Sequence, residues 1–324
     1  MTSGSPSGAA TDHNAALATK IKERALMIRV GIVGTNTSHA GVFAGILNGA
    51  DGTAGADPDA RVVGVWGSGK EGLSGLHQTA AELAETHRID RVAADPSELI
   101  GEIDLALILD DQDGGAIHPD LAEPFLRAGL PTFVDKPMAL ELAKAVALFE
   151  LAAQFGTPLM SCSSLRFADE LKALQATELG ELSLITGVGP GDWYNYGVHT
   201  VEAAVAVYSG RLDWVQQFAG ADRDLTVIGD VSGPKITIGT LRDAPTPFQL
   251  SAYGSGGTAQ TDVGDYRGFY TNTIRAAVGM AATGQPPIKP QDTLTVLSIL
   301  AAGERSRATG RRIALADLLS EASR

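Results

Sequence analysis

The sequence predicts an α/β domain with a parallel sheet, followed by an α+β domain with a large, mostly antiparallel open sheet. Three observations support this prediction. The length of 324 residues is typical of two domains of about 150 residues each. Short apolar runs alternate with helical patterns up to about residue 180. After that point strand-like segments follow one another through Gly, Asp and Pro turns.

The first part of the chain alternates between strand and helix. Continuously apolar, β-branched runs predict buried strands, and the helices between them imply parallel connections, with both faces of the sheet covered. The predicted strands span 28–33, 61–66, 104–109, 131–134 and 157–161, and the predicted helices span 39–47, 76–87, 119–128, 139–155 and 166–177.

The second part has few helices between its strands, which favours antiparallel pairing. Its predicted strands span 182–188, 214–218, 225–229, 235–241 and 248–253, and its predicted helices span 199–208, 269–282 and 293–309. We expect a mobile N-terminal extension at 1–27, a first domain at 28–140 and a second domain at 141–324, with the last helix packing back toward the first domain.

The composition narrows the class of protein. The net charge is −13 and the calculated pI is about 4.9, which argues against nucleic acid or an anionic membrane as partner. Cys162 is the one cysteine of the sequence, so an internal disulfide and a Cys-rich zinc site are excluded. No metal site is expected. The basic residues of the N-terminal extension come after its small-residue stretch, an order that does not fit a signal peptide, and a cytoplasmic protein is expected.

A strand that runs directly into a helix suggests a nucleotide-binding turn. In a Rossmann fold, such a turn directs backbone N–H groups and a helix N-terminus at a pyrophosphate. Gly34 takes the first glycine position of the G-x-G-x-x-G pattern, whereas Asn36 and His39 replace the other two glycines. An ordinary strand–helix turn is the alternative. The candidate cofactor-binding residues here are Gly34, Thr35, Asn36, Thr37, Ser38 and His39.

Two further strand ends bear on cofactor choice. The second strand is followed by Gly67, Ser68 and Lys70 rather than by an acidic residue, which slightly favours NADP(H) over NAD(H). A solvated turn is the equally plausible alternative. The strand predicted at 104–109 is followed by Asp110 and Asp111, with His118 close behind. This stretch lacks the ligand pattern of an EF-hand and is interpreted as an acidic loop at the ligand-binding edge of the sheet.

Two residues are candidates for proton transfer. Lys136 follows the strand predicted at 131–134, where burial can tune its pKa for acid–base chemistry. His199 lies at the start of a helix among polar and aromatic residues, four positions after Asn195. Each residue taken alone is more often a solvated lysine or a structural histidine.

In this order, the motifs resemble the glucose–fructose oxidoreductase/inositol dehydrogenase (Gfo/Idh/MocA) family, from about residue 28 to 318. The segment from Ala128 to Leu140 is similar to the family's AGKHVLCEKPLAL stretch, with Asp135 in place of the usual Glu. Leu165-Arg166-Phe167 resembles its RRF, and Gly197-Val198-His199 falls on its D-x-G-x-H motif. Tyr253 to Thr258 resembles its GTKGS turn, and Gly284 to Asp292 its G..PPVS..D segment.

The resemblance implies residue roles. Lys136 would hydrogen-bond the reacting oxygen and help to orient the nicotinamide, and His199 would be the acid–base partner. The family's aspartate is Asn195 here, which cannot share a proton, so that Asp192 or Tyr196 would compensate. Arg166 and Tyr194 are assigned to substrate binding.

The resemblance also implies a function and leaves two alternatives. The favoured function is an NAD(P)-dependent oxidoreductase that interconverts a hydroxyl and a carbonyl on a sugar, cyclitol or similar polyol, as a homodimer or homotetramer formed through the C-terminal sheet. One alternative is a catalytically silent member that binds nucleotide or sugar and regulates a partner protein. The other is a redox-neutral lyase, isomerase or epimerase that retains its cofactor.

Overall fold

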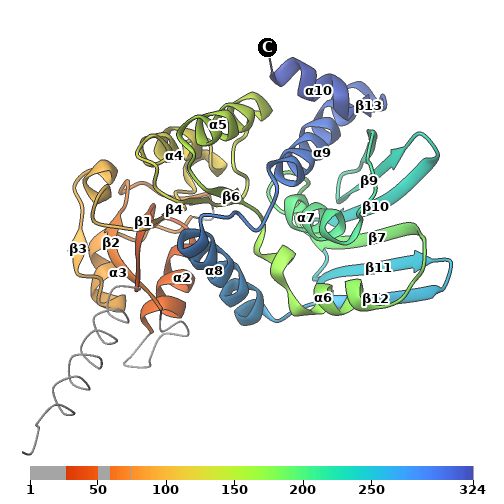
Figure 1. The fold of residues 1–324 in the computed structure, drawn as a ribbon. Helices are drawn as coiled ribbons and strands as arrows, with labels where there is room; N and C mark the ends of the chain where they lie inside the picture. Colours follow the sequence, from red (N-terminus) through yellow and green to blue (C-terminus); the bar gives the residue numbers. More distant parts are fainter. Residues whose placement is uncertain (1–26, 50–58, 74, 324) are drawn as a thin grey trace, which may run out of the picture.

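A computed structural model describes residues 27–49, 59–73 and 75–323. The predicted N-terminal extension, apart from Met27, lies outside these residues. The described chain forms two sheets, one of six strands and one of seven, with helices around and between them (Figure 1). Within the described residues, no helix is long and apolar enough to cross a membrane.

Sheet A is the predicted parallel sheet, with strand order β3-β2-β1-β4-β5-β6. Its strands are apolar on both faces because helices cover both, and Val30, Ile32 and Leu107 are fully buried. The strands are β1 (Ile28–Val33), β2 (Ala60–Trp66), β3 (Arg91–Val92), β4 (Leu105–Ile108), β5 (Thr132–Val134) and β6 (Leu159–Ser161).

The connections of sheet A are helical, as expected for a parallel sheet. They include α2 (Ser38–Asn48), α3 (Ala80–His87), η1 (Pro96–Leu99), η2 (Gln112–Gly114), α4 (His118–Arg127) and α5 (Leu142–Phe155). A helix from much later in the chain, α8 (Tyr266–Thr283), also packs against α2, β1, β4 and β5 (Figure 1). Sheet A therefore buries a face beneath a helix that follows sheet B in the sequence.

Sheet B has the strand order β12-β11-β7-β10-β9-β8-β13 and is antiparallel except for the pair of β7 and β10. The predicted α/β plus α+β fold class is thus confirmed. The strands are β7 (Leu182–Pro190), β8 (Trp214–Ala219), β9 (Arg223–Asp230), β10 (Gly233–Leu241), β11 (Phe248–Gly254), β12 (Gly257–Val263) and β13 (Ile313–Ala314).

Helices pack along sheet B and link it to sheet A. Helix α7 (Gly197–Val207) packs on β7, and α9 (Pro290–Thr309) packs against α7, β8 and α5. The short helices η3 (Ser164–Phe167) and α6 (Asp169–Ala176) connect β6 to β7, and α10 (Leu315–Ala322) follows β13.

Several element predictions need correction. The predicted helix 76–87 begins only at Ala80, where Thr79 and Glu82 form a capping box. The predicted helix 166–177 is two helices, because Ala168 is extended (φ −62°, ψ 135°) and separates η3 from α6. Strand β12 and helix α10 were not predicted. The last strand of sheet A, β6, lies beyond residue 140, and the domain division at that residue remains a prediction.

Candidate active site

The predicted site residues gather at the carboxyl edge of sheet A, where β1, β4, β5 and β6 end. Ligands of open parallel sheets bind at this edge because loops and helix N-termini converge there. The predicted site residues of the second half of the chain come from η3, from residues 192–196 before α7, and from the first turn of α7. The edge thus contains the nucleotide-binding turn, the acidic loop after β4 and the Lys136 segment after β5.

The turn between β1 and α2 has the backbone that a nucleotide-binding turn requires. Gly34 has a positive φ of 105°, and a Cβ at this position would lie 2.2 Å from the backbone nitrogen of Asp110. Only glycine therefore allows β1 and the end of β4 to approach so closely. Thr37 is the N-cap of α2, with its side chain accepting from the backbone N–H of His39 at 3.4 Å.

Asn36 ties this turn to the acidic loop. Its Nδ2 donates to Asp110 Oδ1 at 3.0 Å, and its Oδ1 accepts from the backbone N–H of Asp111 at 2.8 Å. The side chain at the second fingerprint position is thus bonded within the protein. Gly72 packs on the other side of Asn36, because a Cβ on Gly72 would lie 2.0 Å from the Asn36 carbonyl oxygen.

His39 is held between two partners. Its Nδ1–H donates to Asp135 Oδ2 at 2.6 Å, and its Nε2 lies 3.1 Å from the hydroxyl of Tyr270 on α8. Burial alone would raise the pKa of Asp135, but the charge and hydrogen bond of His39 lower it below its ordinary value. The large side chain at the third fingerprint position is therefore part of the protein's own hydrogen-bonding network.

His118 is buried at the start of α4. Its Nδ1–H donates to the carbonyl of Pro137 at 2.9 Å, whereas its Nε2 has no hydrogen-bond partner among the described residues. Burial lowers the pKa of His118. This histidine is neutral at physiological pH and supports the loop that follows Lys136.

Lys136 lies near enough to His199 for its charge to act on the imidazole, although the two residues belong to different halves of the chain. Burial, reinforced by the positive charge of Lys136, lowers the pKa of His199 well below its usual range. Nδ1 of His199 lies 2.7 Å from Oγ of Ser163, which follows β6. The ring of His199 also packs edge-on against Phe248 at a centroid distance of 5.4 Å.

The segment before α7 is folded around Asp192. Its carboxylate accepts from the backbone N–H groups of Tyr194 and Asn195 and from Asn195 Nδ2 at 3.0 Å. The Asn195 side chain therefore bonds to Asp192, not to His199. Tyr196 is 48% exposed, with its ring 6.1 Å from that of His199.

The two predicted substrate-binding residues both have protein partners. Tyr194 donates its hydroxyl to the Leu140 carbonyl at 3.3 Å, and burial raises its pKa to about 12. Arg166 Nε pairs with the buried carboxylate of Glu202, and Arg166 Nη1 lies 3.7 Å from Asp292. These contacts join η3 to α7 and to the start of α9, and a role in substrate binding remains a prediction.

The candidate cofactor-selecting residues lie at the surface after β2. Lys70 is exposed and Ser68 is half-buried, and Ser68 Oγ accepts from the Lys70 backbone N–H at 3.4 Å. Thr35, on the neighbouring turn, donates its hydroxyl to the carbonyl of Gln78 at 2.5 Å. The loop after β2 is thereby attached to the nucleotide-binding turn.

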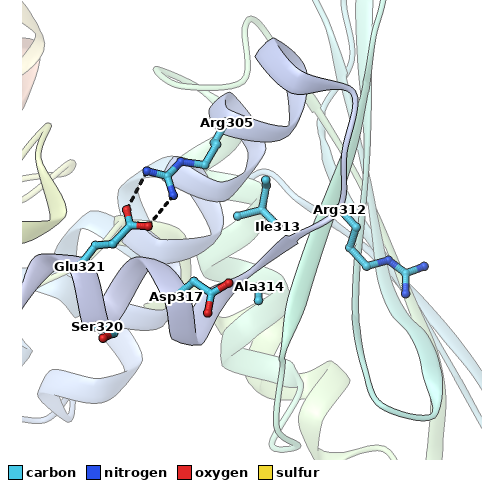
Figure 2. A pocket seen from close by; sticks show the side chains of 7 residues that line it. All are labelled: Arg305, Arg312, Ile313, Ala314, Asp317, Ser320 and Glu321. Carbon is cyan, nitrogen blue, oxygen red and sulfur yellow. Dashed lines mark hydrogen bonds and ion pairs between the residues drawn. The ribbon is translucent and has the colours of Figure 1, made fainter.

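A cavity of about 300 Å³ lies elsewhere, between α9, β13 and α10 (Figure 2). Arg305 and Glu321 face each other across it in a two-pronged ion pair, whereas Arg312 points away and lies 3.8 Å above the Trp214 ring. None of the predicted site residues lines this cavity.

Sequence reasoning missed Ser163 and Glu202. Ser163 stands two residues beyond the end of β6, the same offset that separates Lys136 from the end of β5, and Val134 and Ser161 are paired in the sheet. That shared offset is a signal that could have identified Ser163. Glu202 carries no comparable signal, because only the packing of α7 on η3 brings it to Arg166.

The first part of the chain matches the model of a known protein family. Residues 28–162 match the model of the Gfo/Idh/MocA oxidoreductase family with an NAD-binding Rossmann fold. This span contains all of sheet A and Lys136, which follows β5. Residues 28–162 are thus similar to the Gfo/Idh/MocA family, the family that the motifs predicted.

The proteins to which this chain is similar include inositol dehydrogenases. A myo-inositol dehydrogenase of Streptomyces leeuwenhoekii is 38% identical over 81 residues, which are 25% of this chain and 24% of that protein. The aligned region therefore spans about a quarter of that relative. Two solved structures share the fold: a myo-inositol dehydrogenase from Corynebacterium glutamicum (18% identity, 90% and 99% of the two chains, TM-score 0.73) and a scyllo-inositol dehydrogenase from Lactobacillus casei with NAD(H) and scyllo-inositol (15% identity, 90% and 99%, TM-score 0.73).

The residues at the sheet edge fit a dinucleotide. Gly34 and the N-terminus of α2 provide the close backbone approach and the positive helix end that suit a pyrophosphate. Oδ2 of Asp110 is buried and has no hydrogen-bond donor among the described residues. A ribose hydroxyl is a donor of the kind that this oxygen lacks.

Proposed function

We propose that the protein is an NAD(P)-dependent oxidoreductase that interconverts a hydroxyl and a carbonyl on a cyclitol, sugar or similar polyol. The observation that supports it best is that Lys136 and His199, one from each half of the chain, lie near enough for the charge of Lys136 to act on the imidazole. The inositol dehydrogenases among the relatives support a cyclitol as the first substrate to test.

In this proposal each residue has one task. The Lys136 ammonium donates a hydrogen bond to the reacting oxygen and stabilises the negative charge that develops there. His199 is neutral because burial and Lys136 lower its pKa, so it can accept the hydroxyl proton. The bound nicotinamide supplies the hydride chemistry. Phe248 packs edge-on against the imidazole and covers part of the ring.

The first experiment is to look for the cofactor. The purified protein is denatured and its supernatant examined by mass spectrometry and absorbance at 340 nm, and protein that contains no dinucleotide is titrated with NAD(H) and NADP(H). Bound or micromolar dinucleotide is expected, and it selects the cofactor for a screen of myo-inositol, scyllo-inositol and other polyols. Binding of neither dinucleotide would contradict the proposal and favour the silent, regulatory alternative.

Lys136→Met tests the catalytic assignment. Removing the ammonium should lower kcat by about a hundredfold or more, because one charge-stabilising donor is lost, while dinucleotide binding is retained. The surface variant Lys144→Met, on α5, is the matched control and should keep full activity. Turnover of Lys136→Met within threefold of the wild type would remove Lys136 from the mechanism. Product formation without net NAD(P)H formation would instead identify a redox-neutral enzyme.

We also propose a cytoplasmic homodimer or homotetramer formed through sheet B. Phe218 and Leu225 are paired across β8 and β9, and they are 53% and 47% exposed. Adjacent exposed apolar side chains on a sheet are typical of a surface that another protein covers.

A further inference from the structure

Ser163 is placed to act on His199. Its Oγ lies 2.7 Å from Nδ1 of the imidazole, and the serine is fully buried. It follows β6 at the offset at which Lys136 follows the neighbouring β5. The two adjacent strands therefore present Lys136 and Ser163 side by side, and α7 brings His199 to both.

No carboxylate is hydrogen-bonded to His199 in the described part of the chain. Asp192 accepts its hydrogen bonds from Tyr194 and Asn195, and Asp135 accepts from His39. The charged or titratable groups that act on His199 through space are Lys136, His39 and Asp135. A neutral hydroxyl therefore occupies the place that a carboxylate takes in a histidine–carboxylate pair.

A hydroxyl can hold the imidazole in more than one protonation state. Ser163 Oγ also accepts from the backbone N–H of Leu165 at 3.2 Å, which fixes the position of the oxygen. Its remaining hydrogen can be donated to an unprotonated Nδ1, or its second lone pair can accept from a protonated one. A carboxylate could only accept. In both arrangements Nδ1 stays on Ser163, so that Nε2 is the nitrogen left for substrate.

We propose that Ser163 is the positioning residue for His199. It holds Nδ1, directs Nε2 toward the reacting oxygen, and keeps the ring orientation unchanged when the imidazole takes up or releases the substrate proton. This inference rests on the proposed function, in which His199 is the acid–base partner. It also accounts for Asn195, because His199 obtains its orientation from η3 and does not need a carboxylate at position 195.

Ser163→Ala and Ser163→Thr form the test. The alanine variant should lower kcat about a hundredfold with KM within about twofold, because the base is present but misoriented. The threonine variant retains the hydroxyl and should recover most of the activity. Because alanine also removes the N-cap of η3, Asp95→Ala, which removes the side-chain cap of η1, is the matched control for cap loss and should keep kcat. An unchanged kcat in Ser163→Ala would overturn the inference.

A measurement without substrate separates this inference from the function itself. In ¹⁵N NMR of the imidazoles, with His199 assigned by His199→Gln, the wild type should favour the neutral tautomer with its proton on Nδ1. This tautomer donates to Ser163 Oγ and leaves Nε2 free to accept the substrate proton. Ser163→Ala should alter that preference, whether or not a polyol is ever turned over. Identical tautomer ratios in the wild type and Ser163→Ala would overturn the positioning role. Failure of dinucleotide binding with an altered ratio would contradict only the proposed reaction.

Discussion

Gly67, which follows β2, has little room for a side chain. A Cβ on Gly67 would lie 2.5 Å from Oγ1 of the buried Thr35, which is itself bonded to the Gln78 carbonyl. An aspartate at position 67, which would bond the ribose of NAD, would therefore push on the nucleotide-binding turn. Cofactor choice is better tested at Lys70, whose side chain is exposed.

Lys70→Glu should lower the affinity for NADP(H) about tenfold and change that for NAD(H) by less than twofold. The reason is electrostatic, because a 2′-phosphate would lose an attractive charge and gain a repulsive one. Fluorescence titration with both cofactors measures the effect. Lys172→Glu reverses a charge on the distant helix α6 and is the control. Equal affinities for NADP(H) before and after the Lys70 change would exclude a phosphate contact.

The contact between α9 and the segment before α7 depends on a small residue. The indole of Trp193 is buried and donates from Nε1 to the Leu300 carbonyl at 3.1 Å. A Cβ on Gly303, one turn along α9, would lie 2.4 Å from that nitrogen. The glycine thus allows Trp193 to lie flat on α9 and fixes the segment that leads to His199.

Gly303→Ala should reduce the free energy of unfolding by about 1–3 kcal/mol, the cost of overpacking a filled core. The matched control is Gly279→Ala on α8, where a new Cβ meets nothing within 4 Å. That variant should be neutral or stabilised by up to about 1 kcal/mol, since alanine favours a helix. Urea unfolding curves measure both. A Gly303→Ala protein as stable as Gly279→Ala would mean that the Trp193 contact is not tight.

The elements that could be predicted best from the sequence are those with a clear apolar pattern. The strands of sheet A are continuous apolar runs, so their ends, and with them the place of Lys136, could be located. Strand β12 has the sequence GTAQTDV and is mostly exposed at a sheet edge, so it lacks an apolar alternation. The break at Ala168 was not predictable either. Just before it, Arg166 forms an ion pair with Glu202 on α7, and the sequence does not show that this later helix packs there.

The candidate site could be predicted only where sheet topology groups its residues. Residues that follow strands of one sheet share an edge by topology, which is why the turn at Gly34 and the loop at Asp110 could be grouped. The partner of His199 could not be identified, because the sequence does not show how α7 lies on η3. Spacing along the chain suggested Asn195 as a neighbour, whereas Asn195 turns to Asp192.

At the scale of the whole molecule, two neutral histidines, the buried His118 and the partly buried His199, make stability depend on pH. Burial lowers the folded-state pKa of His118 and of His199 below the value of about 6.5 found in unfolded chains. Their contribution is therefore complete above pH 6.5 and is lost as the pH falls below it, because the unfolded chain then binds protons that the folded chain does not.

The free energy of unfolding should fall between pH 7 and pH 5 by up to about 1.4 kcal/mol per pH unit for each histidine. Urea unfolding at three pH values in this range gives the slope. The double variant His118→Asn/His199→Asn should flatten it, and His77→Asn, at an exposed position, should not. A double variant with the wild-type slope would show that other groups cause the pH dependence.

Helix α8 has a consequence for how this chain could have been assembled in evolution. Its residues Ile274, Ala277 and Val278 share one buried cluster with Phe43 of α2 and Phe133 of sheet A, and its Tyr270 reaches His39. A gene segment that ended at residue 162 would encode every strand of sheet A and still leave that cluster open to water. Recombination could therefore exchange the nucleotide-binding half between relatives only together with a compatible α8, so that the two segments would have to be inherited as a matched pair.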